Sequence, residues 1–243
     1  MATDPTFVSN YRTESVQFTA AGPHVMVAYA AGPSGSRIHS ITGTLDAAGT
    51  TLMKFYRGRI LTDNSLPRPM RHFQERHRLQ AGLTPVLALT NTTNSTITRT
   101  NGSFIDDGIT VNTKLAVLGS NTNIQNQLIF VPTTVAAATL TATGAIFQAA
   151  DATPSGMMCL ARADLLWSKA MVGSDGYSNT VPALNMMDVA LNPSILAAPD
   201  GFLTLEPFEL LLVAYGNPAV FASVVTLPAA GAALGIVTCG GDF

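Results

Sequence analysis

The chain has 243 residues, of which 47% are hydrophobic and only 12% are charged, about half the charged share of an average globular protein. Its formal net charge of −2 argues against general nucleic-acid binding, which needs a strong positive field. Other subunits commonly cover a surface so poor in charge, so the composition favours an assembling protein over a monomer solvated by Thr, Ser, Asn and Gln.

The first 60 residues consist of short β-rich segments separated by Gly, Pro, Asn and Asp, a pattern that predicts a sandwich or a barrel. Asp46-Ala-Ala-Gly49 is typical of a turn, and we expect the strands on either side of it to form one hairpin. The expected strands are Ser15–Thr19, His24–Ala30, Arg37–Leu45 and Thr51–Arg57.

Basic residues gather in the next part of the chain. Of the 13 Lys and Arg residues, 7 fall between Lys54 and Arg78, whereas Ala170–Phe243 contains six acids and no Lys or Arg. Such unlike regions suit docking on neighbouring subunits or on a partner lattice, and charge balance within one molecule explains them nearly as well. Segment 67–79 is either an electrostatic docking arm, in part a short helix, or a solvated connection. The residues predicted to bind a partner are Arg57, Arg59, Arg68, Arg71, Arg76 and Arg78.

A zone rich in Thr, Asn and Gly follows, from about Pro85 to Asp151, with turns at Asp107-Gly108 and at residues 119–123. Four or five short strands in this zone match the size of a small barrel. The expected strands are Ser95–Thr100, Ile109–Leu118, Gln127–Pro132 and Ala138–Phe147.

The last third of the chain has longer apolar segments. Glu206–Tyr215 is compatible with a helix, but Pro207 and Gly216-Asn-Pro218 favour a core strand. The expected strands are Met157–Val172, Phe202–Gly216, Ala219–Leu227 and Ala232–Thr238.

The return of long apolar strands predicts an all-β chain with an insertion. We expect a β-sandwich or jelly-roll-like domain made of residues 1–85 and 152–243, with a small β-barrel inserted at 86–151.

Two parts of the chain resemble the ends of a group of small phage virion proteins. The first is Gly35-Ser-Arg-Ile-His-Ser-Ile41, followed by the turn and by Leu52-Met-Lys-Phe-Tyr-Arg-Gly58, which resembles the opening hairpin of that group. The second is the close of the chain, Cys239-Gly-Gly-Asp-Phe243, since those proteins end on a strand with Gly-Gly-Asp and an aromatic residue.

The middle zone is similar to a small barrel module of phage structural proteins. The similarity rests on Ile97–Ile109 with its Asp-Asp-Gly turn, on Leu115-Ala-Val-Leu-Gly-Ser-Asn-Thr-Asn123 and on Ala138-Thr-Leu-Thr141. The chain departs from the module at Asn112-Thr113, where Gly-Asp is usual, and at Ile124-Gln125, where an Asn-Gly turn is usual.

The two resemblances imply a structural protein of a bacteriophage or phage-like particle, most specifically a capsid decoration (cement) protein. They imply binding to the major capsid protein lattice, self-association with a trimer favoured, and a place on the virion, on the head before the tail, after synthesis in the host cytoplasm. A tail or baseplate component and a host-glycan-binding module are the alternatives.

The sequence contains no recognisable catalytic or metal-binding motif. His72 and His77 are five residues apart, which does not match the zinc spacing on a helix, and Asp106-Asp107 is expected to be a solvated turn. We therefore predict no enzyme, no catalytic residue, no metal and no cofactor. Cys159 and Cys239, in apolar surroundings, are expected to be free thiols.

The sequence also predicts neither secretion nor membrane insertion. The N-terminal residues show no basic segment followed by an apolar run. No stretch of about 18 apolar residues lacks polar interruption, so no transmembrane helix is expected. We expect no direct nucleic-acid contact either.

Overall fold

The computed structural model describes residues 9–19, 23–46, 50–62, 86–120, 124–147, 151–152, 158–172, 189–190, 203–215 and 233–243. Over these residues the protein is all-β, with strands β1 to β16 and one 3-10 helix, η1 (Ile124–Asn126). The strands form curled antiparallel sheets, so the expected fold class, a sandwich with a barrel-like module, is confirmed.

Three sheets make up the molecule. Sheet A contains β1 (Ser9–Thr19), β16 (Ala233–Asp242), β3 (Ser36–Asp46) and β13 (Val189–Ala190) in that order, with β14 (Leu203–Leu205) also paired to β3. Sheet B has the order β2 (Val25–Ala30), β15 (Leu210–Tyr215), β4 (Thr50–Ile60), β12 (Cys159–Val172), β7 (Leu115–Leu118) and β8 (Ile129–Phe130). Sheet C has the order β11 (Asp151–Ala152), β5 (Leu87–Asn91), β6 (Asn94–Arg99), β10 (Thr139–Thr143) and β9 (Thr134–Val135).

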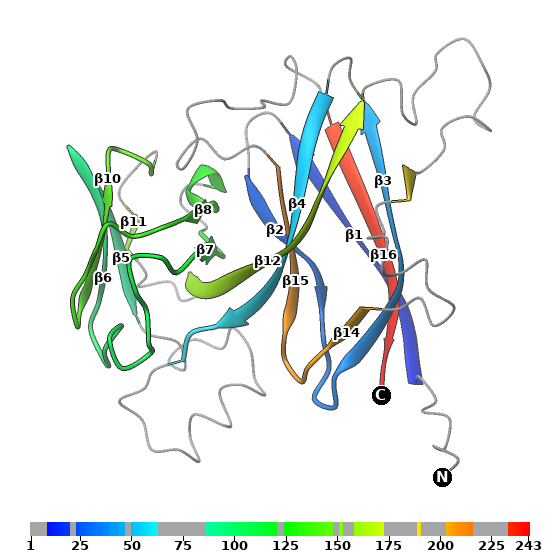
Figure 1. The fold of residues 1–243 in the computed structure, drawn as a ribbon, viewed down its shortest axis with the longest axis horizontal. Helices are drawn as coiled ribbons and strands as arrows, with labels where there is room; N and C mark the ends of the chain where they lie inside the picture. The colour runs from blue at the N-terminus through cyan, green and yellow to red at the C-terminus, as the bar shows by residue number, and fades with distance from the viewer. Residues whose placement is uncertain are drawn as a thin grey trace.

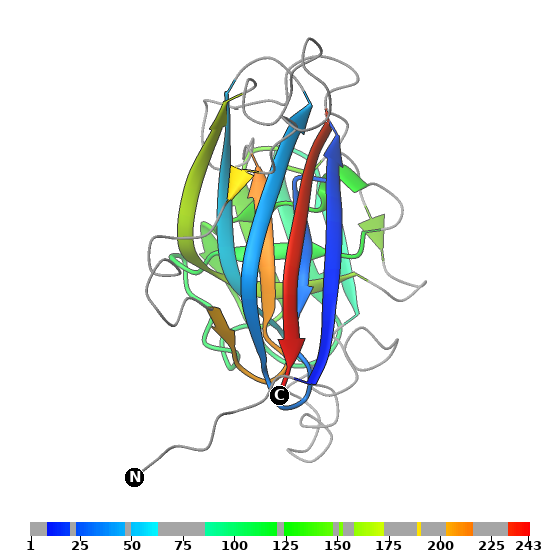
Figure 2. The ribbon, with the colours of Figure 1, turned by 90° about the vertical axis from the view of Figure 1, so that its right-hand side faces the viewer.

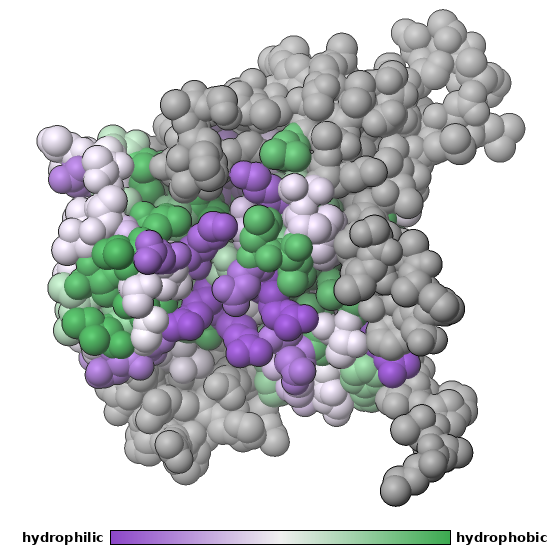
Figure 3. All heavy atoms as spheres, viewed as in Figure 1, coloured by the Kyte–Doolittle hydropathy of each residue, from purple (hydrophilic) through white to green (hydrophobic). Residues whose placement is uncertain are grey.

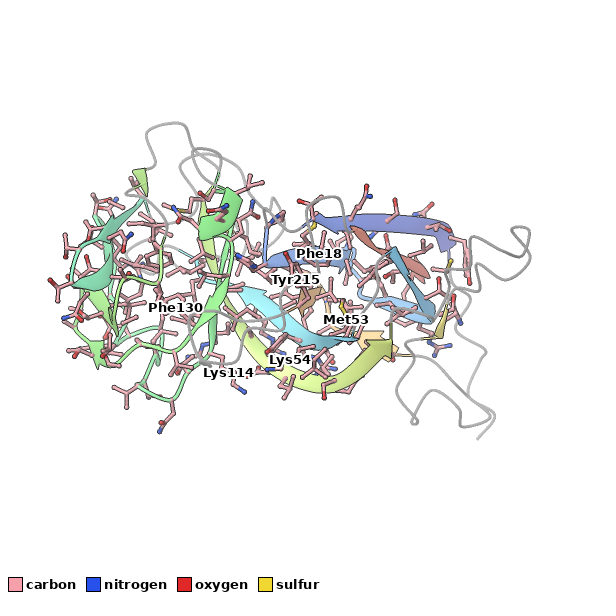
Figure 4. The ribbon with its side chains drawn as sticks, turned by 90° about the horizontal axis from the view of Figure 1, so that it is seen from above. Phe18, Met53, Lys54, Lys114, Phe130 and Tyr215 are labelled. Atoms are coloured by element: carbon pink, nitrogen blue, oxygen red, sulfur yellow. The ribbon has the colours of Figure 1, made fainter. Side chains whose placement is uncertain are left out.

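Sheet B curls back on itself, so the molecule has four layers. The backbone oxygen of Gln127, just before β8, accepts hydrogen bonds from the amides of His24 (2.9 Å) and Val25 (3.1 Å) at the start of β2. The two edge strands of sheet B therefore meet. From one end to the other, the layers are sheet C, the β7–β8 side of sheet B, the β2–β15–β4 side of sheet B, and sheet A (Figures 1 and 4).

Each gap between layers holds its own apolar core. Phe18, Met53 and Tyr215 are buried between sheets A and B, and Phe130 is buried between sheets B and C (Figure 4). Successive residues of a strand point to opposite faces; accordingly Met53 and Phe55 face sheet A, whereas Tyr56 points into the curl.

The inside of the curl is narrow and lined mostly by small or aliphatic side chains. Ala116, Ala161 and Ala163 are buried there beside Tyr56 and Cys159. Burial raises the pKa of Tyr56 and that of Cys159 to about 12, because the apolar interior disfavours the charged form. Both groups therefore remain neutral at physiological pH.

The strand expectations are confirmed for β2, β3, β4, β6, β12 and β16, within a few residues at each end. The expected hairpin of β3 and β4 is wrong, because β3 lies in sheet A and β4 in sheet B. Consecutive strands here cross from one sheet of the sandwich to the other. Of the expected strand Ile109–Leu118 only Leu115–Leu118 is extended, and β5 was not expected.

Other predicted strands differ from the structure in part, or fall on residues that the structure does not describe. The expected strand Phe202–Gly216 is interrupted at Glu206–Glu209, which separates β14 in sheet A from β15 in sheet B. Segments 67–79 and 219–227 lie outside the described residues. Strands β5 to β11 follow one another between β4 and β12, and two of them, β7 and β8, belong to sheet B rather than to sheet C.

A buried ion pair fixes the long connection between β6 and β7. Arg99, whose side chain is fully buried, donates from Nη1 to Asp107 Oδ2 (2.6 Å) and from Nε to the Asn101 oxygen (2.5 Å), and its guanidinium lies 4.9 Å from the centre of the Phe104 ring. Arg162 on β12 donates to the backbone oxygen of Asp107. The Asp107 carboxylate is therefore not solvated as expected, because a buried guanidinium needs an anion beside it.

Replacing Asp107 by Asn should destabilise the protein by about 3 kcal/mol or more, because the buried Arg99 guanidinium then has no counter-charge. Chemical denaturation with the unfolding midpoint as readout measures this loss. The matched control is Asp106→Asn, a neutralisation of the exposed neighbour, which should leave the midpoint nearly unchanged. Equal shifts for the two variants would contradict the role given to the ion pair.

Candidate partner-binding surface

The turn between β14 and β15 is a corner at which the chain passes from sheet A to sheet B. Phe208 has a φ of 64° there, a left-handed conformation that is costly for a residue with a β-carbon. The Phe208 amide donates to the Gly32 oxygen (3.3 Å), and the Ala31 amide donates to the Glu209 oxygen (2.9 Å). Those bonds join this corner to the other crossing, between β2 and β3.

Glu209 holds the corner against β4. Its carboxylate Oε1 accepts a hydrogen bond from Arg59 Nε (2.8 Å) and forms an ion pair with Arg59 Nη2 (2.7 Å), and Oε2 accepts a hydrogen bond from the Glu206 amide (2.9 Å). Arg57 Nε lies 3.3 Å from Oε2, although no aligned hydrogen bond forms between them. The Glu209 side chain is only 2% exposed, so its buried charge is balanced by two arginines and by a backbone donor.

Two residues of β12 extend this group across the sheet. Arg162 lies opposite Arg59, and Asp164 lies opposite Arg57, in the β4–β12 ladder. Directly opposite residues of an antiparallel pair share one face. We call the five residues Arg57, Arg59, Arg162, Asp164 and Glu209 the charged seam; it contains three cations and two anions.

Figure 3 shows that hydrophilic side chains gather over the middle of one face of the molecule. A hollow of about 430 Å³ adjoins the charged seam at Arg162 and Asp164, between the 110–114 connection and residues 162–165 of β12. Lys114 lines this hollow, and Figure 4 shows Lys114 and Lys54 on the same side of the molecule. The surface is therefore polar and slightly cationic, which suits an acidic protein surface more than an apolar ligand.

The structure describes two of the six residues predicted to bind a partner. Arg57 and Arg59 both lie in the charged seam, and both are engaged by Glu209. Arg59 is still 62% exposed, so its guanidinium remains accessible from outside. Arg68, Arg71, Arg76 and Arg78 lie outside the described residues.

Four members of this surface were missed from the sequence: Arg162, Asp164, Lys114 and Glu209. Arg162 and Lys114 lie far along the chain from the basic run, and only the pairing of β12 with β4 and β7 brings them near it. For Glu209 a weak signal existed, since the acid-rich last third of the chain complements the basic run. Charge complementarity alone does not identify which acid pairs with which base.

Residues 35–41 and the close of the chain, 239–243, meet at the β2–β3 crossing. Strand β16 pairs with β3 so that Asp242 lies opposite Ser36. The Asp242 carboxylate accepts hydrogen bonds from the Gly32 amide (3.2 Å), from Arg12 Nη1 (3.3 Å) and from the Ser36 hydroxyl. A β-carbon at Gly240 would lie 2.6 Å from the Arg37 oxygen, so the close approach of the two strands requires glycine there.

Of the other residues considered for chemistry, His72 and His77 lie outside the described residues. No cluster of three or more His, Cys, Asp or Glu residues that could hold a metal ion occurs among the described residues. Burial lowers the pKa of His24, because the apolar surroundings disfavour the imidazolium. Trp167, half-buried, stacks on Phe55 with ring centres 4.5 Å apart and packs on the sandwich core. In the part of the chain that the structure describes, no helix is long and apolar enough to span a membrane.

No protein-family model matches this chain, and neither a curated protein nor a solved structure is significantly similar to it.

Replacing Glu209 by Gln should lower the free energy of unfolding by about 2 kcal/mol, because Arg57 and Arg59 lose a buried charged acceptor. The exposed part of Arg59 recovers water, which keeps the loss below that of a fully buried pair. Urea denaturation measures the change, and Glu206→Gln, at an exposed position of the same corner, is the control. A Glu209→Gln variant as stable as the control would show that the ion pairs do not hold the corner.

Proposed function

We propose that the chain is a structural component of a bacteriophage or phage-like particle, most specifically a decoration protein that binds and stabilises the head lattice. The observation that carries the proposal is that the first half of the resembling opening segment, Gly35–Ile41, meets the resembling close of the chain, whereas its second half, Leu52–Gly58, lies in sheet B. Gly35–Ile41 and Cys239–Phe243 are nearly 200 residues apart in the sequence, yet they pair in sheet A and share the Asp242 hydrogen bonds. If both segments resemble the same family because they belong to the same part of its fold, they are expected to lie next to each other in this chain.

The surface chemistry supports binding rather than catalysis. The charged seam holds an accessible Arg59 fixed by a buried carboxylate, so little side-chain entropy is lost when it contacts an acidic partner. The major capsid protein lattice is the proposed partner. The low charge of the chain supports self-association as well, because subunit contacts would cover weakly solvated surface.

Immunogold electron microscopy of purified particles, with an antibody against this chain, tests the proposal. The particles come from cells that carry the gene, and particles from cells in which the gene is deleted serve as the control. Gold distributed over the head is the expected result. Gold confined to the tail would replace the head role by a tail or baseplate role, and particles without gold would overturn the virion assignment.

The basic run provides a second prediction. Alanine at Arg68, Arg71, Arg76 and Arg78 together should weaken binding of the chain to particles that lack it, and rising salt should weaken binding of the unmodified chain in the same way, because both remove attraction between exposed charges. Co-sedimentation across a salt series measures both. Arg57 and Arg59 are poorer targets, since their loss also removes the cations that balance the buried Glu209 carboxylate. Binding that is indifferent to salt and to the four alanines would refute the electrostatic contact.

A further inference from the structure

Strand β1 forms a margin of sheet A and is much longer than the other strands at the margins of sheets A and C. It lies at the margin of sheet A, where β16 is the strand that pairs with it, and runs eleven residues, Ser9–Thr19 (Figure 2). The other described margins of sheets A and C are strands of two or three residues: β9, β11, β13 and β14. The margins of sheet B, β2 and β8, meet through Gln127. Among the described strands, the long unclosed edge is therefore β1.

Long open edges are unusual because their unpaired amides and carbonyls attract another strand. Proteins usually protect such edges with Pro, with Lys, with bulges, with inward-pointing charged residues or with short strands. The β1 sequence, Ser-Asn-Tyr-Arg-Thr-Glu-Ser-Val-Gln-Phe-Thr, contains neither Pro nor Lys, and its one irregularity is a bulge near Asn10. The bulge and the inward-pointing Arg12 and Glu14 restrict this edge to a strand that supplies partners for those two charges.

The side chains of β1 alternate regularly between its two faces. Tyr11, Thr13 and Gln17 are exposed, whereas Arg12 and Glu14 are half-buried on the side toward sheet B. Arg12 Nε lies 2.9 Å from Glu14 Oε1, and the Arg12 guanidinium lies 4.6 Å from the centre of the Tyr29 ring. These contacts hold the two charges in place before any partner arrives, which lowers the entropy cost of pairing.

We propose that β1 pairs with β1 of a second copy of this chain, antiparallel and about a two-fold axis at Thr13. In this register Thr13 faces Thr13 of the other copy, and Arg12 faces Glu14 of the other copy on each side of the axis. Opposite charges and Thr–Thr pairs are favourable directly across an antiparallel ladder. Shifting the axis by one residue would place two Arg12 side chains or two Glu14 side chains opposite each other, which is unfavourable.

The pairing joins two copies of sheet A into one continuous sheet. It deepens the proposed function and rests on its self-association part, since it names the surface through which the chain assembles. A two-fold contact of identical strands closes after two copies, so it predicts a dimer instead of the trimer expected from the family resemblance.

Light scattering coupled to size exclusion, on the full chain without particles, measures the assembly directly. We expect a mass of twice the chain mass. A monomer at the highest soluble concentration, or a trimer, would overturn the pairing. Neither result bears on immunogold labelling of particles, so this proposal and the virion assignment fail separately.

A cysteine cross-link tests the register. In a Cys239→Ser background, which removes the thiol that lies opposite residue 13 within the chain, Thr13→Cys should give a disulfide-linked dimer on a non-reducing gel. Directly opposite Cα atoms are about 4.5–5.5 Å apart in an antiparallel pair, within the range that a disulfide spans.

Gln17→Cys in the same background is the matched control, because Gln17 is exposed on the same face of β1. In the proposed register the two copies of residue 17 are about 26 Å apart along the sheet, too far to link. Cross-linking of Thr13→Cys alone supports the pairing. Equal cross-linking of the two variants, or none in either, would contradict it.

Charge reversal provides an independent check. Glu14→Lys places a lysine opposite each Arg12 and should weaken the dimer about tenfold, through two unfavourable pairs. Asp106→Lys makes the same charge change at an exposed residue away from β1 and should leave the dimer unchanged. Equal effects of the two variants would show that net charge, and not the register, controls assembly.

Discussion

The rest of the structure depends on the pairing of β12 with strands on both of its edges. Along one edge, Ala161–Val172 pairs with β4, and along the other, Cys159–Arg162 pairs with β7. Strand β4 belongs to the sandwich, and β7 comes from the segment that also builds sheet C. A single strand thus connects the two ends of the molecule, and its pairing on both sides makes sheet B curl until Gln127 reaches β2.

This constraint places polar groups where the layers meet. The outer face of the β4–β12 ladder is covered by sheet A at one end and by sheet C at the other, and the charged seam lies between the two covered regions. Glu209 and Asp242 each accept backbone and side-chain hydrogen bonds at a crossing between sheets A and B. Buried or half-buried carboxylates with fully used oxygens fix such crossings because leaving them unpaired would be costly.

Features whose signal lies within a few neighbouring residues could be predicted from the sequence, and features that depend on distant residues could not. β-Rich segments between turn residues predicted β2, β3 and β4, and a long apolar run predicted β12, because both signals lie within the strand itself. They did not show that β3 and β4 lie in different sheets, since the composition of a strand and of the turn beside it carries no information on the partner strand. The corner at Glu206–Glu209 was missed because an apolar run continues on both sides of it, and the crossing depends on contacts with residues 31–32 and β4.

Ion pairs between residues distant in the sequence could not be predicted from the sequence either. The basic run drew attention to Arg57 and Arg59, but their partner Glu209 lies 150 residues away in the sequence. Asp107 was predicted to be a solvated acid in a turn. Its partner Arg99 is nearby in the sequence but becomes buried only when sheet C packs on β7 and β8. Burial of a charged group is a property of the packed layers, not of its neighbours in the chain.

Hydrogen exchange measured across a denaturant series tests most directly whether sheet B couples the stability of sheets A and C. Peptides from β5 and β6 in sheet C, from β3 and β16 in sheet A, and from β4 and β12 should lose protection at one common midpoint, because all three cores need the curled sheet B. A lower midpoint for sheet C, with β4 and β12 still protected, would show instead that the inserted segment folds as a unit of its own and that β12 does not couple the layers.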